Sequence, residues 1–296
     1  MTTEVLHYAA FTTVEGGGNP AGVVLDATGL DDAAMLTIAQ DVGYSETAFL
    51  SVGATDDGTT RADVRYFSPV AEVAFCGHAT LATAVAFAER HGPGRLALST
   101  AAGDVAVSTR SEAGRFVATL SSPPTHTRPV DPDVLTEALA ALRWTDADLD
   151  PAYPPHVAFA GNDHLVLGVR SRETLTALDY DFTALEELMA RVGWTTAHLF
   201  WAEDEVTFHV RNPFPPGGVV EDPATGAAAA AFGGYLRDLH LVSTPTRMTI
   251  HQGHDMGRPS ELLVDVTADD PSVAVTGRAA AIPAWDHPTR PANSAD

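Results

Sequence analysis

The sequence predicts an α+β protein of two similar halves, each with strands wrapped around one central helix. Three observations support this prediction. Short segments in which apolar and polar residues alternate, typical of half-buried strands, occur along the whole chain. Two helical segments are apolar on almost every side, as expected for helices enclosed by other elements. The order of strand, loop, glycine and buried helix occurs once in each half of the chain.

Ten segments are predicted as strands from their alternating pattern. Five lie in the first half, at 46–52, 64–67, 96–99, 105–109 and 116–120. Five lie in the second half, at 164–169, 198–201, 207–211, 248–251 and 262–266. Between the two groups, residues 121–132 are rich in proline and serine, so this segment is the best candidate for a boundary between domains.

Surface helices are predicted at 32–42, 132–142 and 183–192, the first with Asp31 as its N-cap and Gly43 just past its end. The two buried helices follow Gly77 and Gly226. A helix N-terminus presents free N–H groups and a partial positive charge, and a glycine there lets a ligand approach the backbone. We therefore expect two such termini, facing one cleft, to hold a carboxylate or a developing enolate without lysine or metal.

Composition excludes several kinds of function. A formal net charge of −22 argues against nucleic acids and anionic membranes as partners, since both need a basic surface. All 17 basic residues are arginine, which excludes Schiff-base, P-loop and kinase lysines. The single cysteine, Cys76, rules out an internal disulfide, and the N-terminus lacks the features of a signal peptide. Together these features favour a cytoplasmic location.

Four residues beside the two buried helices are candidates for acid–base chemistry, and each has a plainer alternative. Glu46 starts a predicted strand among apolar residues and is either a general base or a solvated residue at the strand end. Asp222 is either part of the site or an Asx-turn or N-cap residue. His78 is either an acid or hydrogen-bond donor to a substrate, or a residue that holds the loop. Cys76 fits a small buried side chain better than a nucleophile.

No metal site is expected, because the sequence has no HExxH motif, no paired CxxC motif and no cluster of three carboxylates. His251 and His254 have the spacing H-x-x-H, but glycines surround them and no helix is predicted there.

Six sequence motifs, in order along almost the whole chain, resemble those of the PhzF-like family of phenazine-biosynthesis-related proteins. They are GNPAGVV at 18–24, SETAF at 45–49, YFSP at 66–69, FCGHAT at 75–80, EDPATG at 221–226, and QG with MGRPS at 252–260. The resemblance implies a diaminopimelate epimerase-like fold of two pseudo-symmetric domains. In that fold each domain is a curled sheet or open barrel around a central helix, with the active site in the cleft between the domains.

The resemblance also implies domain limits and an assembly. We expect an N-terminal half at 1–124 and a C-terminal half at 125–272, with a final strand at about 273–284 that returns to the first half. A homodimer is implied, as is activity without a cofactor.

The resemblance assigns roles to residues as well. Glu46 is similar to the family's general acid/base, and His78 and Asp222 to the residues that bind and orient the substrate. Substrate contacts are also implied for Gly77, Gly226, Ala227 and Asn19. Ala227 departs from the phenazine enzyme, which has a serine there, so the phenazine substrate is the part of the resemblance that this residue puts in doubt.

These observations predict an isomerase that moves a proton between carbons of a small carboxylic acid, similar to trans-2,3-dihydro-3-hydroxyanthranilate isomerase. One alternative is a two-base epimerase or racemase that uses Glu46 and Asp222 on opposite faces of one carbon. Another is a dimeric small-acid-binding protein without turnover.

Overall fold

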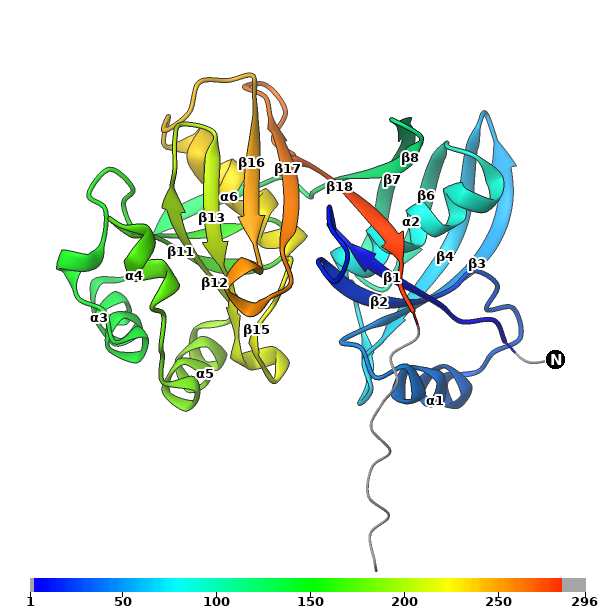
Figure 1. Ribbon diagram of the computed structural model, residues 1–296, viewed down its shortest axis with the longest axis horizontal. Coiled ribbons are helices and arrows are strands. Elements are labelled where there is room, and N and C mark those ends of the chain that lie inside the picture. The colour runs from blue at the N-terminus through cyan, green and yellow to red at the C-terminus, as the bar shows by residue number, and fades with distance from the viewer. Residues whose placement is uncertain (1–2, 284–296) are drawn as a thin grey trace, which may run out of the picture.

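The computed structural model describes residues 3–283, which form two lobes joined side by side (Figure 1). The N-terminal lobe is a closed barrel of eight strands, because the last strand of the chain pairs with both the first and the eighth in sequence order. Its strands are β1 (Leu6–Ala10), β2 (Asn19–Val24), β3 (Thr47–Asp56), β4 (Thr59–Phe67), β6 (Arg95–Thr100), β7 (Gly103–Glu112), β8 (Arg115–Ser121) and β18 (Ala274–Ala281).

The central helix of this lobe, α2 (Gly77–His91), contacts strands on several sides of the barrel, including β1, β2, β7, β8 and β18. Enclosure on all sides explains why its residues are apolar almost all round. The first helix, α1 (Asp32–Val42), lies outside the barrel, with Asp31 as its N-cap and Gly43 as its C-cap, as the sequence predicts. A short strand, β5 (Glu72–Val73), pairs with β4.

The C-terminal lobe is a curled open sheet that continues from β18. Its other strands are β9 (His126–Pro129), β10 (His156–Phe159), β11 (Asp163–Gly168), β12 (Trp194–Ala202), β13 (Thr207–Arg211), β16 (Thr246–Gln252) and β17 (Ser260–Val266). Its central helix, α6 (Gly226–Asp238), packs on β9, β10 and β17. The remaining elements are α3 (Pro132–Leu142), α4 (Arg172–Thr176), α5 (Phe182–Val192), β14 (Pro213–Phe214) and β15 (Val219–Glu221).

The two lobes repeat one topology. In the first lobe the successive pairings from β1 to β8 are antiparallel, parallel, antiparallel, parallel, antiparallel and antiparallel. The same order runs from β10 to β18 in the second lobe. In both lobes the central helix makes the second parallel crossover, from β4 to β6 and from β13 to β16. The predicted α+β fold of two similar halves around central helices is confirmed.

One apolar core is continuous across both lobes, because buried residues of α2, α6 and the strands around them belong to a single cluster. The two central helices contact each other within it. Phe11, just past β1, lies between α6 and β18, since its ring is 3.5 Å from the position that a Cβ at Gly226 would take and also contacts Gly277 of β18. Packing between the two helices and around Phe11 therefore holds the lobes together. Among the described residues, no helix is long and apolar enough to cross a bilayer.

Several sequence predictions are corrected by the structure. Glu46 lies directly before β3, which begins at Thr47 and not at residue 46, and its carbonyl accepts a hydrogen bond from the Gly22 N–H of β2. Within the segment 121–132, β8 of the first lobe ends at Ser121 and β9 of the second lobe begins at His126, where it pairs with β10. Strands β1, β2, β9 and β10 were missed; β2 is buried along its length and lacks the alternation used to find strands. Strand β18 lies within the predicted range 273–284, whose last residue is outside the described chain. The division at residue 124 stays a prediction.

Candidate active site

Three side chains meet at the N-terminus of α2. Glu46 lies between the turn that ends α1 and the start of β3, and its Oε2 is 3.4 Å from Nε2 of His78. Cys76 is the N-cap residue of α2, and its Sγ lies 3.3 Å from Nδ1 of the same imidazole. His78 and Cys76 are buried, whereas 18% of the Glu46 side chain is exposed. Glu46 is therefore the member of this group that a small molecule can reach.

The imidazole of His78 has three polar neighbours. Its Nε2 lies 3.4 Å from the Glu46 carboxylate and 3.5 Å from Oγ of Ser45, and its Nδ1 faces the Cys76 thiol. Burial, followed by the charge of Glu46, raises the pKa of the Cys76 thiol well above its usual range. With no cation bound, Cys76 is therefore a protonated, buried thiol, which fits its structural interpretation better than a role as nucleophile or base.

Asp222 lies between β15 and the start of α6, and both of its carboxylate oxygens accept hydrogen bonds. Nδ2 of Asn19, the first residue of β2, donates to Oδ1 at 2.7 Å. Oγ1 of Thr225 donates to Oδ2 at 2.6 Å. Gln252 supports this loop by donating to the Asp222 carbonyl at 2.7 Å and to Thr225 Oγ1 at 3.0 Å. The helix N-cap is Thr225, so the N-cap alternative for Asp222 is wrong.

Asp222 and the group at α2 act on each other electrostatically. Burial raises the pKa of Asp222 to about 6; His78, Thr225 and Asn19 oppose this shift, while the charge of Glu46 adds to it. The charge of Asp222 in turn contributes to the raised pKa of Cys76. The structure thus brings Glu46, His78 and Asp222 together, although they lie on three separate segments of the sequence.

The two helix N-termini have room for a ligand. A Cβ at Gly77 would meet only a ring atom of Phe75, at 3.9 Å, and one at Gly226 would meet Phe11 at 3.5 Å. Neither glycine has a positive φ. Neither backbone conformation nor protein packing therefore requires glycine at these positions. The remaining reason for glycine at these positions is that it lets a ligand approach the backbone closely, as at other helix termini that bind anions. Ala227 follows Gly226 in the first turn of α6.

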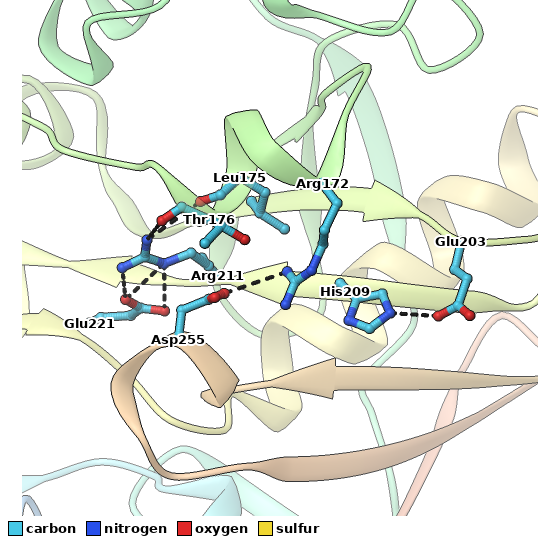
Figure 2. Close-up of polar contacts among 8 residues, drawn as sticks. All are labelled: Arg172, Leu175, Thr176, Glu203, His209, Arg211, Glu221 and Asp255. Atoms are coloured by element: carbon cyan, nitrogen blue, oxygen red, sulfur yellow. Dashed lines mark hydrogen bonds and ion pairs between the residues drawn. The ribbon is translucent and has the colours of Figure 1, made fainter.

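A buried ion pair anchors the loop that carries Asp222, and sequence reasoning missed it. Arg211, at the end of β13, binds Glu221 through Nε and Nη2, with its shortest contact at 2.6 Å (Figure 2). It also donates to the carbonyls of Leu175 and Thr176. Only 5% of the Glu221 side chain is exposed. In the sequence, Glu221 was the only residue that pointed to this ion pair. The sequence alone does not distinguish a buried, paired Glu221 from a solvated residue beside Asp222.

A hollow of about 620 Å³ lies away from this site. It surrounds the C-terminal end of α2, near His91, Gly92 and Pro93, and none of the candidate site residues lines it. It lies a helix length from Gly77, roughly 20 Å for a helix of this size. The chemistry of the side chains, and not cavity size, therefore locates the candidate site.

Sequence reasoning also missed a set of potential metal ligands. One donor atom from each of Glu46, Cys76 and His78 lies within 4.8 Å of the others. No metal-binding sequence motif predicts this set of ligands, since Glu46 is 30 residues from Cys76 along the chain.

Comparison with known proteins shows the family of this chain. The family model described as phenazine biosynthesis-like protein (PhzC-PhzF) matches residues 8–284. The chain is 31% identical to the uncharacterized isomerase YddE of Escherichia coli K12 over 277 residues, which cover 91% of this chain and 92% of that protein. It is 32% identical to trans-2,3-dihydro-3-hydroxyanthranilate isomerase of Pseudomonas fluorescens over 254 residues, which cover 85% and 86%.

Solved structures show the same fold. A Bacillus anthracis phenazine biosynthesis protein of the PhzF family superposes with a TM-score of 0.82 at 25% identity, covering 94% of this chain and 96% of its own. A hydroxyproline epimerase of Agrobacterium vitis superposes with a TM-score of 0.61 at 15% identity, covering 94% and 90%. The second likeness concerns the fold alone.

Proposed function

Because this chain belongs to the phenazine biosynthesis-like PhzC-PhzF family, we propose that it is a cofactor-independent isomerase that moves a proton between two carbons of a small carboxylic acid. That it is an isomerase follows from its relatives, which include several named isomerases. The transfer of a proton between carbons is proposed from the group of Glu46, His78 and Asp222. In this group the Glu46 carboxylate can be reached from solvent, and both carboxylate oxygens of Asp222 are held by hydrogen bonds.

In the proposed reaction Glu46 is the base. Its carboxylate takes a proton from a carbon made acidic by a neighbouring carboxylate or conjugated system, and the C–H electrons shift into a new double bond. The protonated Glu46 then returns the proton to another carbon, so no electrons are gained or lost. His78 beside it binds a polar substituent of the substrate and keeps Glu46 in place.

The other residues bind and orient the substrate in this proposal. The N–H groups at the starts of α2 and α6, at Gly77 and Gly226 and at the residues that follow them, hold the substrate carboxylate and the negative charge of the transition state. Asp222 accepts a hydrogen bond from an amino or hydroxyl group of the substrate. Asn19, which is 2% exposed, acts by holding Asp222 in position. The enzyme would work as a cytoplasmic homodimer.

Ala227 is the position at which this chain departs from the phenazine enzyme. It offers a backbone N–H at the start of α6 but no hydroxyl. We therefore expect a substrate related to trans-2,3-dihydro-3-hydroxyanthranilate in its carboxylate and its acidic carbon, with one polar group fewer or differently placed. The variant Ala227→Ser should raise kcat/KM on that compound if the missing hydroxyl limits activity.

The two-base alternative is less compatible with the hydrogen bonds of Asp222. Both of its carboxylate oxygens already accept bonds from Asn19 and Thr225, which suits an orienting acceptor better than a base. Incubation in D₂O followed by proton NMR distinguishes the two reactions. The isomerase moves a double bond, and it places deuterium at the carbon that receives the proton to the extent that the protonated Glu46 exchanges with solvent before it returns the proton. A two-base enzyme places deuterium at the original carbon with inverted configuration, and a binding protein exchanges nothing.

Trans-2,3-dihydro-3-hydroxyanthranilate is the first compound to test, followed by small cyclic amino and hydroxy acids. Rearrangement of any of them supports the proposal. Tight binding across this set without any exchange would contradict it and favour the binding protein.

A further inference from the structure

We propose that the catalytic group is also a binding site for a thiophilic divalent cation of the Zn²⁺ class, held by Glu46, Cys76 and His78, and that the bound ion shuts the enzyme off. The ion would act as an inhibitor and not as a cofactor, because it occupies the carboxylate that serves as base. The inhibition rests on the proposed function, whereas the binding of the ion does not.

The distances between the donor atoms already approach those of a tetrahedral site. Nε2 of His78 lies 3.4 Å from Oε2 of Glu46 and 3.8 Å from Sγ of Cys76. Zinc–ligand bonds of about 2.0–2.3 Å place neighbouring donors of a tetrahedron roughly 3.3–3.6 Å apart. The third pair, the Glu46 carboxylate oxygen and Sγ of Cys76, lies within 4.8 Å, so a three-ligand site requires the group to contract around the ion.

The types of donor also fit this class of ion. Thiolate, imidazole and carboxylate are the ligands that zinc takes in proteins, and three protein ligands leave a fourth position open. Glu46, which is partly exposed, gives the ion its way in. On binding, the cation replaces the proton of the Cys76 thiol, which is released to solvent. The negative charge of Asp222 nearby adds to the attraction for a cation.

Inhibition follows from the shared ligand. A carboxylate bound to the ion cannot take a proton from carbon, and the ion lies where the reacting carbon has to approach Glu46. Substrate and cation therefore exclude one another, so inhibition should be competitive and reversed by a chelator.

Cobalt(II) is the probe for this site, because it takes the place of zinc and its absorption reports its ligands. A thiolate ligand adds a charge-transfer band in the near ultraviolet, and tetrahedral geometry strengthens the visible bands. Cys76 is the only cysteine of the chain, so any thiolate band must come from it. This matters because a second group of imidazoles, His209, His251 and His254, has neighbouring ring centres 5.2 and 5.5 Å apart on the outer face of β13 and β16. Cobalt bound there gives no thiolate band.

The experiment is a titration of the untagged protein with Co²⁺, followed by displacement with Zn²⁺. We expect a thiolate band that saturates at one equivalent and is abolished by one equivalent of Zn²⁺. Glu46→Gln should weaken Co²⁺ binding by more than about tenfold, since loss of a supporting residue around a metal ligand already costs 10–100-fold. The matched control His251→Gln should leave the band unchanged.

Two variants together distinguish loss of a metal ligand from misfolding. Cys76→Ser should abolish the thiolate band, and circular dichroism will show whether that buried position still folds. Glu46→Gln changes a partly exposed residue and gives an independent answer. The absence of a thiolate band from the folded protein would overturn the proposal, as would a band unaffected by Glu46→Gln. Neither outcome depends on turnover, so failure of the metal site and failure of the proposed isomerase activity remain distinguishable.

Discussion

The side-chain amide of Asn19 donates a hydrogen bond of 2.7 Å to Oδ1 of Asp222, across 203 residues of sequence. The same amide donates to the carbonyl of Ala224 at 3.1 Å. Asn19 opens β2 in the barrel of the first lobe, whereas Asp222 precedes α6 in the second. One buried side chain therefore ties the site residue of the second lobe to the strand beside Glu46.

Removal of this link tests its importance. Asn19→Ala leaves Oδ1 of Asp222 and the Ala224 carbonyl without their donor, so we expect the free energy of unfolding to fall by about 1–3 kcal/mol. Because Asp222 is then held only by Thr225, kcat/KM should fall as well. Urea denaturation and steady-state kinetics measure the two effects, with Asn162→Ala at an exposed turn as the control. An unchanged kcat/KM would mean that Asn19 has only a structural role.

The ion pair of Arg211 and Glu221 should be important for stability. Arg211→Met leaves the Glu221 carboxylate buried and unpaired, which costs about 3–5 kcal/mol of the free energy of unfolding. Arg247→Met is the matched control, since Arg247 pairs with Asp265 at an exposed site and such pairs contribute about 0–1 kcal/mol. Thermal and urea denaturation compare the two variants. Equal losses would contradict the argument from burial.

The two helix-terminal glycines should matter for binding and not for folding. Gly77→Ala and Gly226→Ala add a methyl group that the protein accommodates but a bound carboxylate does not. We expect unchanged melting temperatures and a KM raised by roughly tenfold, equivalent to about 1.4 kcal/mol. Gly94→Ala, which meets no atom within 4 Å, is the control. Normal KM values in both variants would remove the helix termini from the binding site.

Two buried histidines in the second lobe predict how stability depends on pH. Burial lowers the pKa of His164 to about 4 and that of His198 to about 3, with the charge of His164 adding to the second shift. Both pKa values lie below the unfolded value of about 6.5, so the unfolded chain binds more protons between these limits. The stabilisation is therefore complete above pH 6.5 and is lost as the pH falls towards 4.

The size of this effect is of the order of a few kcal/mol. Urea denaturation between roughly pH 4.5 and 7.5 measures the slope of the free energy of unfolding against pH. This range covers most of the interval in which the unfolded chain binds more protons than the folded protein. His198→Phe removes one titrating ring, whose centre lies 4.7 Å from that of Phe232, and should flatten the slope. His126→Asn, at an exposed position, should leave the slope unchanged. A slope insensitive to His198→Phe would contradict the assignment.

The sequence predicted the fold well where local signals were strong. Helix α1 begins and ends at its predicted residues because Asp31 and Gly43 cap it. Both central helices were recognised because full enclosure makes them apolar on all sides. Strand β2 was missed, since a strand buried on both faces shows no alternation. The closure of the first barrel by β18 could not be read from local pattern, because it depends on pairing between residues far apart in sequence.

Only part of the candidate site could be predicted from the sequence. Glu46, His78 and Asp222 were found through motifs, and the structure places them together. The supporting residues Gln252 and Arg211 were not found, because their partners are backbone and carboxylate groups brought close only by the folded loop. The metal-ligand set escaped notice for the same reason, since one of its members comes from a different segment.

The assignment of Glu46 as the base is the central claim, and the most direct test compares Glu46→Gln with the unchanged protein by proton NMR in D₂O on a compound that the protein rearranges. Glutamine keeps the size and hydrogen-bonding reach of the side chain but cannot accept the carbon-bound proton. We predict that the variant folds and binds the compound, yet shows neither rearrangement nor deuterium incorporation. Rearrangement by Glu46→Gln at the rate of the unchanged protein would contradict the account.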